Sequence, residues 1–371
     1  MMTFTRRKAL AGAAALAVAP ALVRAQSPGG LLEEAGFASD LGERLDAGIR
    51  SGLLHNVHSV VLMRSGRLVL ERYYEGSDQS GGQALGFIRF GAGTLHDLRS
   101  VTKSIVSLLY GIALERGAVP PPEAPLYAQF PDYADLAEPA RGGILIEHAL
   151  TMSIGLEWDE TISYADPANS EIMMERAPDR YRFVLERPIV HPPGTRWRYS
   201  GGCTALLGRL IEKGTGQKLP EFAAEVLFKP LGITTIAWRQ GRDGVHSASG
   251  GLRLLPRDLA KIGQLVLQHG VWKDERIVPE SWIAASIKPV LPTGDGLEYG
   301  RQWWLGTGSV PALNGPQRWF AGFGNGGQRL WLMPSAELCC VVTAGNYNQP
   351  GNGAFPTRIW REIVLANLLK V

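Results

Sequence analysis

Ser100 and Lys103 are the two residues whose types and spacing best suit covalent chemistry. Apolar residues recur at helical spacing over 101–113 and Gly117 follows, so the sequence predicts a helix that begins at Ser100. Residues three apart on a helix share a face, which places the lysine beside the hydroxyl. A serine becomes a good nucleophile once a neighbour takes its proton; a lysine whose pKa is lowered by burial can do so, or can hold an anionic base in place. The tetrapeptide alone, however, fits a helix-capping serine and a solvated lysine better.

A tyrosine and a glycine-rich segment favour the catalytic interpretation of Ser100 and Lys103 over the capping one. Tyr199 lies in a glycine-flanked loop that leads into a predicted helix, and a phenol next to an ammonium ionises more readily and can act as a base. The segment 322–328 lies between two strand-like runs and leaves backbone N–H groups free for an oxyanion. It also matches the glycine pattern of dinucleotide-binding proteins, but a strand-like run follows where that pattern needs a helix, which excludes this interpretation.

The elements expected around these residues fall into three groups along the chain. Strands at 58–63 and 67–74 form a hairpin, 75–95 is expected to be a loop, helices fill the middle, and strands return before a final amphipathic helix at 357–369. This order predicts an α+β fold, with one antiparallel sheet built from both chain ends, flanked by helices, and an inserted, mostly helical region. The cleft between the two parts is the expected ligand site. Further helices are expected at 144–152, 170–176, 203–213, 219–228, 256–269 and 280–288, and further strands at 299–305, 318–323, 328–333 and 338–344.

Three short motifs, in this order, resemble those of the serine β-lactamase and penicillin-recognising family, in its class C and esterase-like branch. They are the segment from Ser100 to Lys103, Tyr199-Ser200-Gly201, and the segment 325–327 (Asn-Gly-Gly). Within that branch the chain is similar to the 6-aminohexanoate-dimer-hydrolase-like serine hydrolases. The resemblance spans about residues 45–371 and implies one domain with the β-lactamase/transpeptidase-like fold.

The resemblance also implies a role for each matching position. Ser100 would be the nucleophile, Lys103 its partner, and Tyr199 the general base and acid. The backbone N–H groups of Ser100 and Gln328 would form the oxyanion hole. The implied reaction is hydrolysis of a small ester or amide through an acyl-serine intermediate. The positions implied to contact the substrate are Gly201, Asn325, Gly326 and Gly327.

Two of these positions depart from the class C pattern. Gly201 stands where class C β-lactamases have an asparagine whose side chain contacts the substrate amide. Asn325 opens the third motif, where a cation would recognise a substrate carboxylate. Both departures favour an esterase or small-amide hydrolase. A true β-lactamase or DD-peptidase, and a catalytically silent binding or sensor protein of the same fold, stay open as alternatives.

The first 25 residues have the three-part pattern of an export signal. Paired arginines, Arg6 and Arg7, precede an apolar run of about 15 residues, and small residues follow before Gln26. This pattern resembles a twin-arginine signal and predicts a periplasmic or secreted protein with no stable membrane anchor after processing. Residues 26–44 are expected to be a loose segment. Four of the 38 lysines and arginines lie in the signal, so the remaining 34 nearly balance 35 acidic residues, and no nucleic-acid partner is expected.

The sequence gives no indication of a metal or another cofactor. Its seven histidines show no spacing typical of metal ligands, and each is expected to be structural or exposed. Asp159 and Glu160 are expected in a solvated loop. The three cysteines, two of them adjacent, are expected to be buried apolar residues without a disulfide.

Overall fold

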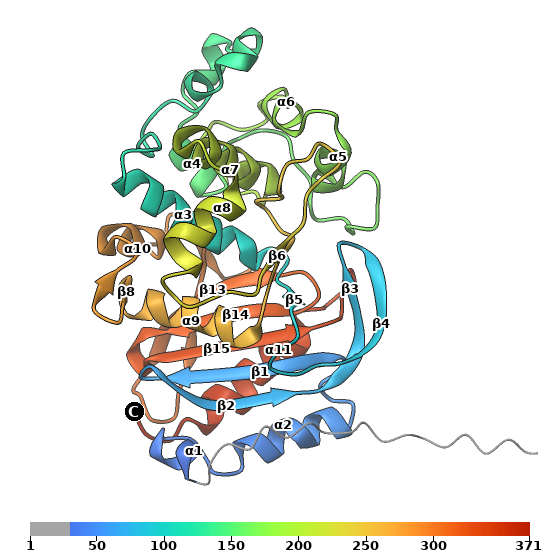
Figure 1. Cartoon of the computed structure of the whole chain (residues 1–371), viewed down its shortest axis with the longest axis vertical. Helices are drawn as coiled ribbons and strands as arrows, with labels where there is room; N and C mark the ends of the chain where they lie inside the picture. Colours follow the sequence, from blue (N-terminus) through green and yellow to red (C-terminus); the bar gives the residue numbers. More distant parts are fainter. Residues whose placement is uncertain (1–29) are drawn as a thin grey trace, which may run out of the picture.

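The computed structural model describes residues 30–371 and is built on one antiparallel sheet of eight strands (Figure 1). The strand order is β10-β11-β12-β13-β14-β15-β1-β2. The pairing of β1 with β15, next to the β2 edge, joins the two ends of the chain. The predicted α+β fold, with a sheet built from both chain ends, is therefore confirmed. The strands are β1 (Val57–Arg64), β2 (Arg67–Tyr73), β10 (Leu291–Pro292), β11 (Glu298–Tyr299), β12 (Trp304–Ser309), β13 (Pro316–Gly324), β14 (Gln328–Met333) and β15 (Leu338–Ala344).

Both faces of this sheet are covered, which its sequence pattern explains. Successive side chains of a strand point to opposite faces, so the fully apolar β15 sends Cys339 and Val341 into one core and Cys340 and Val342 into another. The first core lies under α9 (Pro256–Leu267) and the helical region, and the second under α2 (Leu41–Arg50) and the C-terminal helices (Figure 1). All three cysteines are buried and free, as expected.

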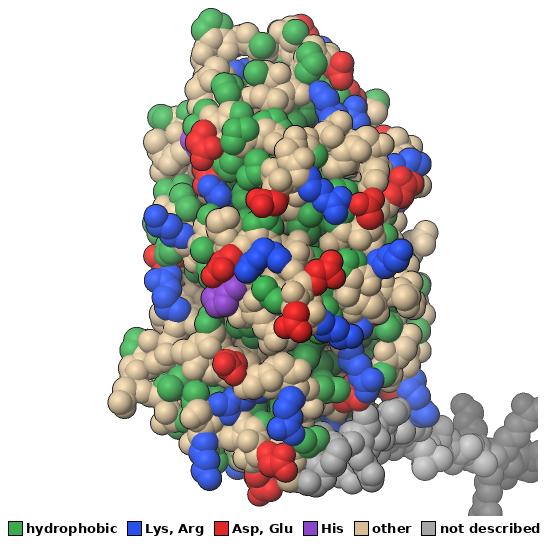
Figure 2. All heavy atoms as spheres, turned by 60° about the vertical axis from the view of Figure 1, so that its left-hand side comes forward, with side chains coloured by type: hydrophobic (Ala, Val, Ile, Leu, Met, Phe, Trp, Pro, Cys, Tyr) green, Lys and Arg blue, Asp and Glu red, His purple; other side chains and the backbone are tan. Residues whose placement is uncertain are grey.

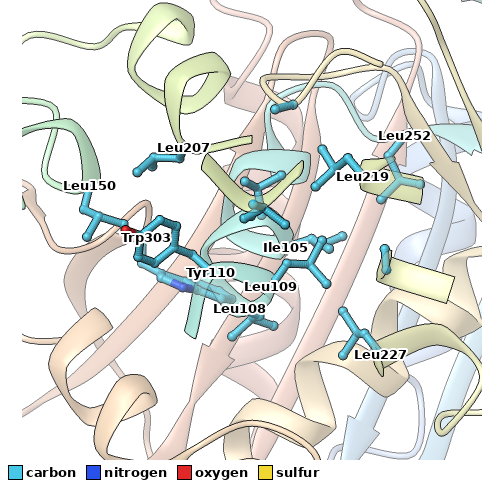
Figure 3. Packing of buried hydrophobic residues seen from close by; sticks show 14 of the residues in the cluster. Ile105, Leu108, Leu109, Tyr110, Leu150, Leu207, Leu219, Leu227, Leu252 and Trp303 are labelled. Carbon is cyan, nitrogen blue, oxygen red and sulfur yellow. The ribbon is translucent and has the colours of Figure 1, made fainter. Parts of the chain in front are cut away.

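The helical region is organised by two long helices, α3 (Val101–Glu115) and α7 (Gly201–Thr215), which pack against each other. Figure 3 shows Ile105, Leu108 and Leu109 of α3 surrounded by leucines from α7 and from the segments around it. Because α3 is buried on nearly all sides, its first turn is held rigidly above the sheet. The other helices are α4 (Ile146–Leu150), α5 (Ser170–Arg176), α6 (Arg180–Leu185), α8 (Leu219–Ala223) and α10 (Glu280–Ser286), with shorter turns η1 (Tyr127–Gln129), η2 (Pro131–Leu136), η3 (Pro139–Arg141), η4 (Ala224–Phe228) and η5 (Pro334–Ala336).

The segment 75–95, expected to be a loop, contains a hairpin instead. Strand β3 (Glu75–Ser80) pairs with β4 (Gln83–Arg89), and the two-residue turn between them is Gly81-Gly82, both with positive φ. The polar residues of β3 and the glycines around the turn hid this hairpin, and little of it is buried apart from residues such as Asp78. Three shorter strands, β5 (His96–Asp97), β7 (Leu252–Leu254) and β6 (Ala237–Trp238), form a separate sheet, and β8 (Val271–Trp272) pairs with β9 (Glu275–Arg276).

The two ends of the chain also differ from expectation. Residues 31–44 are not loose, because α1 (Leu31–Glu34) and α2 bury Phe37 and Leu41 against the sheet. The expected signal at 1–25 lies outside the described residues. The final helix is divided into α11 (Ala354–Arg358), η6 (Ile359–Val364) and η7 (Leu365–Asn367).

The face of the molecule in Figure 2 is of mixed charge. On the face shown in Figure 2, acidic and basic side chains are interspersed, as the near balance of charge in the sequence predicts. Among residues 30–371, no helix has the length and apolarity needed to span a bilayer.

Candidate active site

Ser100 lies at the start of α3, directly after the short strand β5. The turn between them places Arg99 at a φ of 49°, and the Asp97 side chain holds this turn by accepting a hydrogen bond from the Arg99 N–H at 3.0 Å. The Lys103 side chain, only 1% exposed, donates to Ser100 Oγ at 3.1 Å and to the Ser249 carbonyl at 2.8 Å. The predicted serine–lysine pair is therefore formed, and the partly exposed hydroxyl faces a cleft.

Tyr199 joins this pair from the loop before α7. Ser200 caps α7 by accepting from the Cys203 N–H, which fixes the end of the loop. The Lys103 Nζ atom lies 5.0 Å from the centre of the Tyr199 ring, and Tyr199 and Ser100 line the same cavity. Burial raises the pKa of Tyr199 well above its ordinary value, with Glu160 adding to the rise, although the neighbouring Ser100 hydroxyl opposes it. In the free protein burial therefore opposes ionisation of this phenol, and the role of Tyr199 as a base stays a prediction.

Two carboxyl groups that the sequence analysis did not assign to the site, Glu160 and Glu171, complete the cluster. Glu160, expected in a solvated loop, accepts from the Trp158 indole at 2.5 Å and from the Tyr164 hydroxyl at 2.7 Å. Glu171 accepts from the Ser249 hydroxyl at 2.5 Å and lies 4.0 Å from Lys103 Nζ. Neither carboxyl belongs to a motif or a periodic pattern, so only the fold of the 155–180 segment brings them to Lys103.

The two buried carboxyls are close enough to shift each other's pKa, and two like charges in one buried site favour a proton on one of them. Burial raises the pKa of Glu160 to about 8, and the neighbouring charge of Glu171 contributes. Burial also acts to raise the pKa of Glu171, but Lys103 and the neighbouring Glu160 outweigh it and lower that pKa below its ordinary value. Glu160 therefore holds the proton and Glu171 is the carboxylate at neutral pH.

Packing explains why position 201 is a glycine, and the sequence did not show this reason. A Cβ at this position would lie 2.7 Å from the Glu171 carboxyl carbon, and the Gly201 N–H donates to Glu160 at 2.5 Å. The two glutamates therefore fill the space in which an asparagine side chain would lie. The prediction that Gly201 itself contacts substrate is not supported, because it lies behind these carboxyls and lines neither of the cavities that contain Ser100.

The residues that line the cleft near the third motif lie slightly earlier in the chain than predicted. A Cβ on Gly324 would lie 2.5 Å from the Leu98 carbonyl oxygen, so only glycine lets the end of β13 approach the nucleophile this closely. Asn325 follows it and lines the cleft. Gly326 and Gly327, with φ of 89° and 101°, then turn the chain away into β14.

Gln328 does not lie in the cleft. Its fully buried side chain is bound to the backbone of Ala344 on β15, to which Nε2 donates at 2.6 Å. It pairs with Gly324 across the hairpin and lines neither cavity that contains Ser100. The cavity lining therefore does not support Gln328 as an oxyanion donor, or Gly326 and Gly327 as substrate contacts, and Gly324 and Asn325 line the cleft instead.

Two cavities open on either side of Ser100, with volumes of about 430 and 450 Å³. They share Ser100, Tyr164, Asn325 and Asn348 as lining residues. We call the first the charged side and the second the aromatic side. The charged side is also lined by Glu171, Glu175, Arg176, Arg239 and Arg242, and the aromatic side by Tyr199, Trp304, Phe323 and Arg329.

Arg329 provides a cation at the cleft that the third motif does not. Its guanidinium is 4.5 Å from the centre of the Phe323 ring and donates to the carbonyls of Gly324 and Gln328. Burial lowers the pKa of Arg329 to about 10. Within residues 30–371 it forms no salt bridge with a carboxylate. The absence of a cation in the segment 325–327 therefore does not leave the cleft without one.

Comparison with known proteins decides the family. The model of the Beta-lactamase family matches residues 49–366, nearly the whole described chain. The chain belongs to this family. It is a serine hydrolase of the β-lactamase fold, and its curated relatives include enzymes named as hydrolases and esterases.

Two curated relatives and one solved structure illustrate this membership. The chain is 27% identical to the 6-aminohexanoate-dimer hydrolase of Paenarthrobacter ureafaciens over 301 residues, 74% of this chain and 71% of the relative. It is 27% identical to Esterase EstB of Burkholderia gladioli over 214 residues, 54% and 52% of the two chains. A putative 6-aminohexanoate-dimer hydrolase from Bacillus anthracis shares the fold, with a TM-score of 0.67, 22% identity, and coverage of 86% and 80%.

Proposed function

We propose that this protein hydrolyses a small carboxylic ester or linear amide through an acyl-enzyme on Ser100. The observation that carries the proposal is Lys103 Nζ 3.1 Å from Ser100 Oγ, in a cleft where the same Nζ lies 5.0 Å from the centre of the Tyr199 ring. A nucleophile held by a lysine and a phenol at the start of a buried helix is the arrangement that acyl transfer requires.

In the first half of the reaction, Ser100 Oγ attacks the carbonyl carbon of the substrate. Lys103 and Tyr199 act together as the base, in the state in which one of the two groups has already lost its proton. This pair takes the hydroxyl proton as the C–O bond forms. The same pair then protonates the alcohol or amine as its bond to the acyl carbon breaks. Lys103 stabilises the base form by its charge, against the burial that favours neutral Tyr199.

The negative charge on the carbonyl oxygen needs donors fixed before the reaction. The Ser100 N–H lies at the beginning of α3, where the helix field favours an anion. We assign the second donor to the N–H of Asn325, which follows the glycine that contacts Leu98. In the second half, water attacks the acyl carbon, the Lys103–Tyr199 pair takes its proton, and the Ser100 Oγ–acyl bond breaks to release the acid.

The site favours esters and linear amides over β-lactams and peptidoglycan peptides. The side-chain amide that would contact the amide of such substrates has no room at position 201, because Glu171 fills that space. The curated relatives named as a dimer hydrolase and an esterase support the same choice.

The test is steady-state turnover of a substrate panel: p-nitrophenyl esters, a linear amide dimer, a chromogenic cephalosporin and a D-alanyl peptide. We expect turnover of the first two classes, and a loss of roughly 10⁴-fold or more in Ser100→Ala. Ser107→Ala, two turns along the same helix, is the control, since Ser107 bonds only the Arg301 carbonyl outside the cleft. Turnover that survives in Ser100→Ala would refute the proposal, and ligand binding without turnover by the wild type would favour a silent sensor.

We also propose that the protein is exported before it acts. The support is the arginine pair, apolar run and small-residue site within residues 1–25 of the sequence. Cell fractionation followed by N-terminal sequencing tests this. A periplasmic or secreted protein that begins near Gln26 is expected, whereas a cytoplasmic protein that retains Arg6 and Arg7 would contradict it.

A further inference from the structure

A second cluster of chemical groups lies outside the cleft, where β1, β3 and β5 meet. His58, Asp78 and His96 are 0%, 6% and 1% exposed, and one potential ligand atom from each lies within 4.8 Å of the others. His58 Nδ1 is 2.8 Å from His96 Nε2, and the latter is 3.9 Å from Asp78 Oδ1. The histidines are 38 residues apart in the chain, so no metal-binding spacing could have shown the cluster in the sequence.

The hydrogen bonds around His58 fix which of its nitrogens carries hydrogen. Its Nε2 lies 3.1 Å from Asn56 Oδ1. That atom is an oxygen, because it accepts from the Ser77 N–H while the Asn56 amide nitrogen donates to the Ser77 carbonyl. Nε2 therefore donates, and neutral His58 has its lone pair on Nδ1.

His96 is fixed in the same way from its other side. Its Nδ1 lies 3.1 Å from the Asp97 carbonyl oxygen, which can only accept, so neutral His96 has its lone pair on Nε2. The two atoms that face each other at 2.8 Å are therefore both lone-pair acceptors, with a carboxylate oxygen beside them. Two imidazole lone pairs at this separation, with a carboxylate oxygen within 4.8 Å of both, are stabilised by a cation between them.

The donor set and its surroundings fit a divalent transition metal. Zn²⁺ binds imidazole nitrogen and carboxylate oxygen at about 2.0–2.2 Å, and its tetrahedral ligands are about 3.3 Å apart, between the two separations observed. Metal-bound histidines and carboxylates are held from behind by hydrogen bonds. Here, Asn56 and the Asp97 carbonyl hold the imidazoles, and the Tyr347 hydroxyl donates to Asp78 Oδ1 at 2.9 Å.

We propose that His58, Asp78 and His96 bind one divalent transition-metal ion of the Zn²⁺ class. Three protein ligands leave a fourth position for water. The ion joins the β3–β4 hairpin, through Asp78, to the main sheet and to the strand that leads to Ser100. Its role is to hold this side of the cleft in place. The prediction from sequence that the protein binds no metal is replaced by this proposal.

Cobalt(II) is the probe, because its visible absorption reports coordination directly. The full chain, first dialysed against a chelator, is titrated with Co²⁺. We expect absorption that saturates at one equivalent, disappears on addition of Zn²⁺, and accompanies a rise in Tm of several degrees. His96→Gln and Asp78→Asn should lose the saturating signal. Tyr347→Phe removes only the bond behind Asp78 and should weaken Co²⁺ binding by roughly 10–100-fold.

His148→Gln is the matched control, since this half-buried histidine accepts from the Leu145 N–H far from the cluster in sequence and should leave Co²⁺ binding unchanged. Wild-type protein that shows neither the absorption nor the Tm rise with excess metal would overturn the proposal and leave a proton between the two imidazoles. One equivalent bound equally by the wild type, His96→Gln and Asp78→Asn would also overturn it, since the ion would then lie elsewhere. The Co²⁺ titration of the wild type tests the proposal by itself, even if a variant fails to fold.

Discussion

The charged side and the aromatic side of the cleft share the nucleophile but are built from different physical interactions. On the charged side, the ionic groups neutralise one another: Arg239 pairs with Glu175 at 3.6 Å, and Lys103 lies 4.0 Å from Glu171. On the aromatic side, Tyr199 stacks on Trp304, Trp304 stacks on Phe323, and Arg329 has no carboxylate partner within the described chain.

The difference indicates separate tasks for the two sides. Paired charges of both signs hold protons and geometry in place, whereas exposed aromatic faces beside a single cation bind an apolar or anionic part of a ligand. Catalytic power should therefore depend on Lys103, Tyr199 and the carboxyls around them, and substrate affinity on the Trp304 and Phe323 faces beside Arg329. The following variants test that division, beginning with the largest expected effect.

Lys103→Met should reduce kcat/KM by about 10³-fold or more for every substrate alike. The variant keeps the length of the buried side chain but removes the donor to Ser100 Oγ and the positive charge that stabilises the base. Initial rates with two esters of different acyl groups measure this loss. Lys261→Met, which removes a lysine paired with Asp258 on α9, is the control and should keep wild-type rates. A loss of kcat/KM with only one of the two esters would contradict the assignment of Lys103 to catalysis rather than to substrate affinity.

Glu160→Gln should change the pH dependence more than the maximal rate. Because the folded pKa of about 8 lies above the ordinary 4.5, Glu160 loses its proton only above about pH 8. The added negative charge beside Glu171 then opposes formation of the Tyr199 anion, so kcat should fall. Glutamine stays neutral, and its kcat should remain level through this range. Glu157→Gln, in the exposed part of the same segment, should retain the wild-type fall.

The same group makes a prediction about stability. Between about pH 4.5 and 8 the folded protein holds a proton on Glu160 that the unfolded chain has lost, so the free energy of unfolding decreases as pH rises through this window. Urea unfolding at several pH values should show a smaller decrease in Glu160→Gln than in the wild type. Equal slopes in the two proteins would place the proton on another group.

Trp304→Ala should act mainly on KM. The indole contacts both Tyr199 and Phe323, and its loss removes on the order of 1 kcal/mol of aromatic contact with a ligand, or about a five- to tenfold rise in KM. Esters that share one acyl group but differ in the alcohol show which part of the substrate this side binds. Trp272→Ala, in the β8–β9 hairpin, is the control. A fall in kcat larger than the rise in KM would contradict the assignment.

What the sequence could predict follows from local patterns. The helix that begins at Ser100 and the apolar strands near both ends have the periodicity of their elements, so the fold and the Ser100–Lys103 pair were predictable. Tyr199 was predictable only from the ordered motifs, since no local rule links residues 100 and 199. The β3–β4 hairpin has polar residues on an edge, and propensity alone does not distinguish it from a loop.

The groups that were missed depend on long-range contacts. Glu160 and His96 are ordinary polar residues in sequence, and each acquires its surroundings only when distant segments meet it. Gln328 lines neither cavity at Ser100 because the turn at 325–327 bends the chain before position 328, and a shift in register moves a residue out of the cleft. Such contacts and registers are set by tertiary packing, which a single sequence does not display.

The most direct test of the central claim is intact-protein mass spectrometry during turnover. The protein is mixed with a p-nitrophenyl ester, quenched in acid within milliseconds to seconds, weighed and digested. The account predicts a mass increase equal to the acyl group, located on the peptide that contains Ser100, formed in a burst with p-nitrophenol and absent from Ser100→Ala. An acyl group on a different residue, or continued hydrolysis by Ser100→Ala, would contradict it.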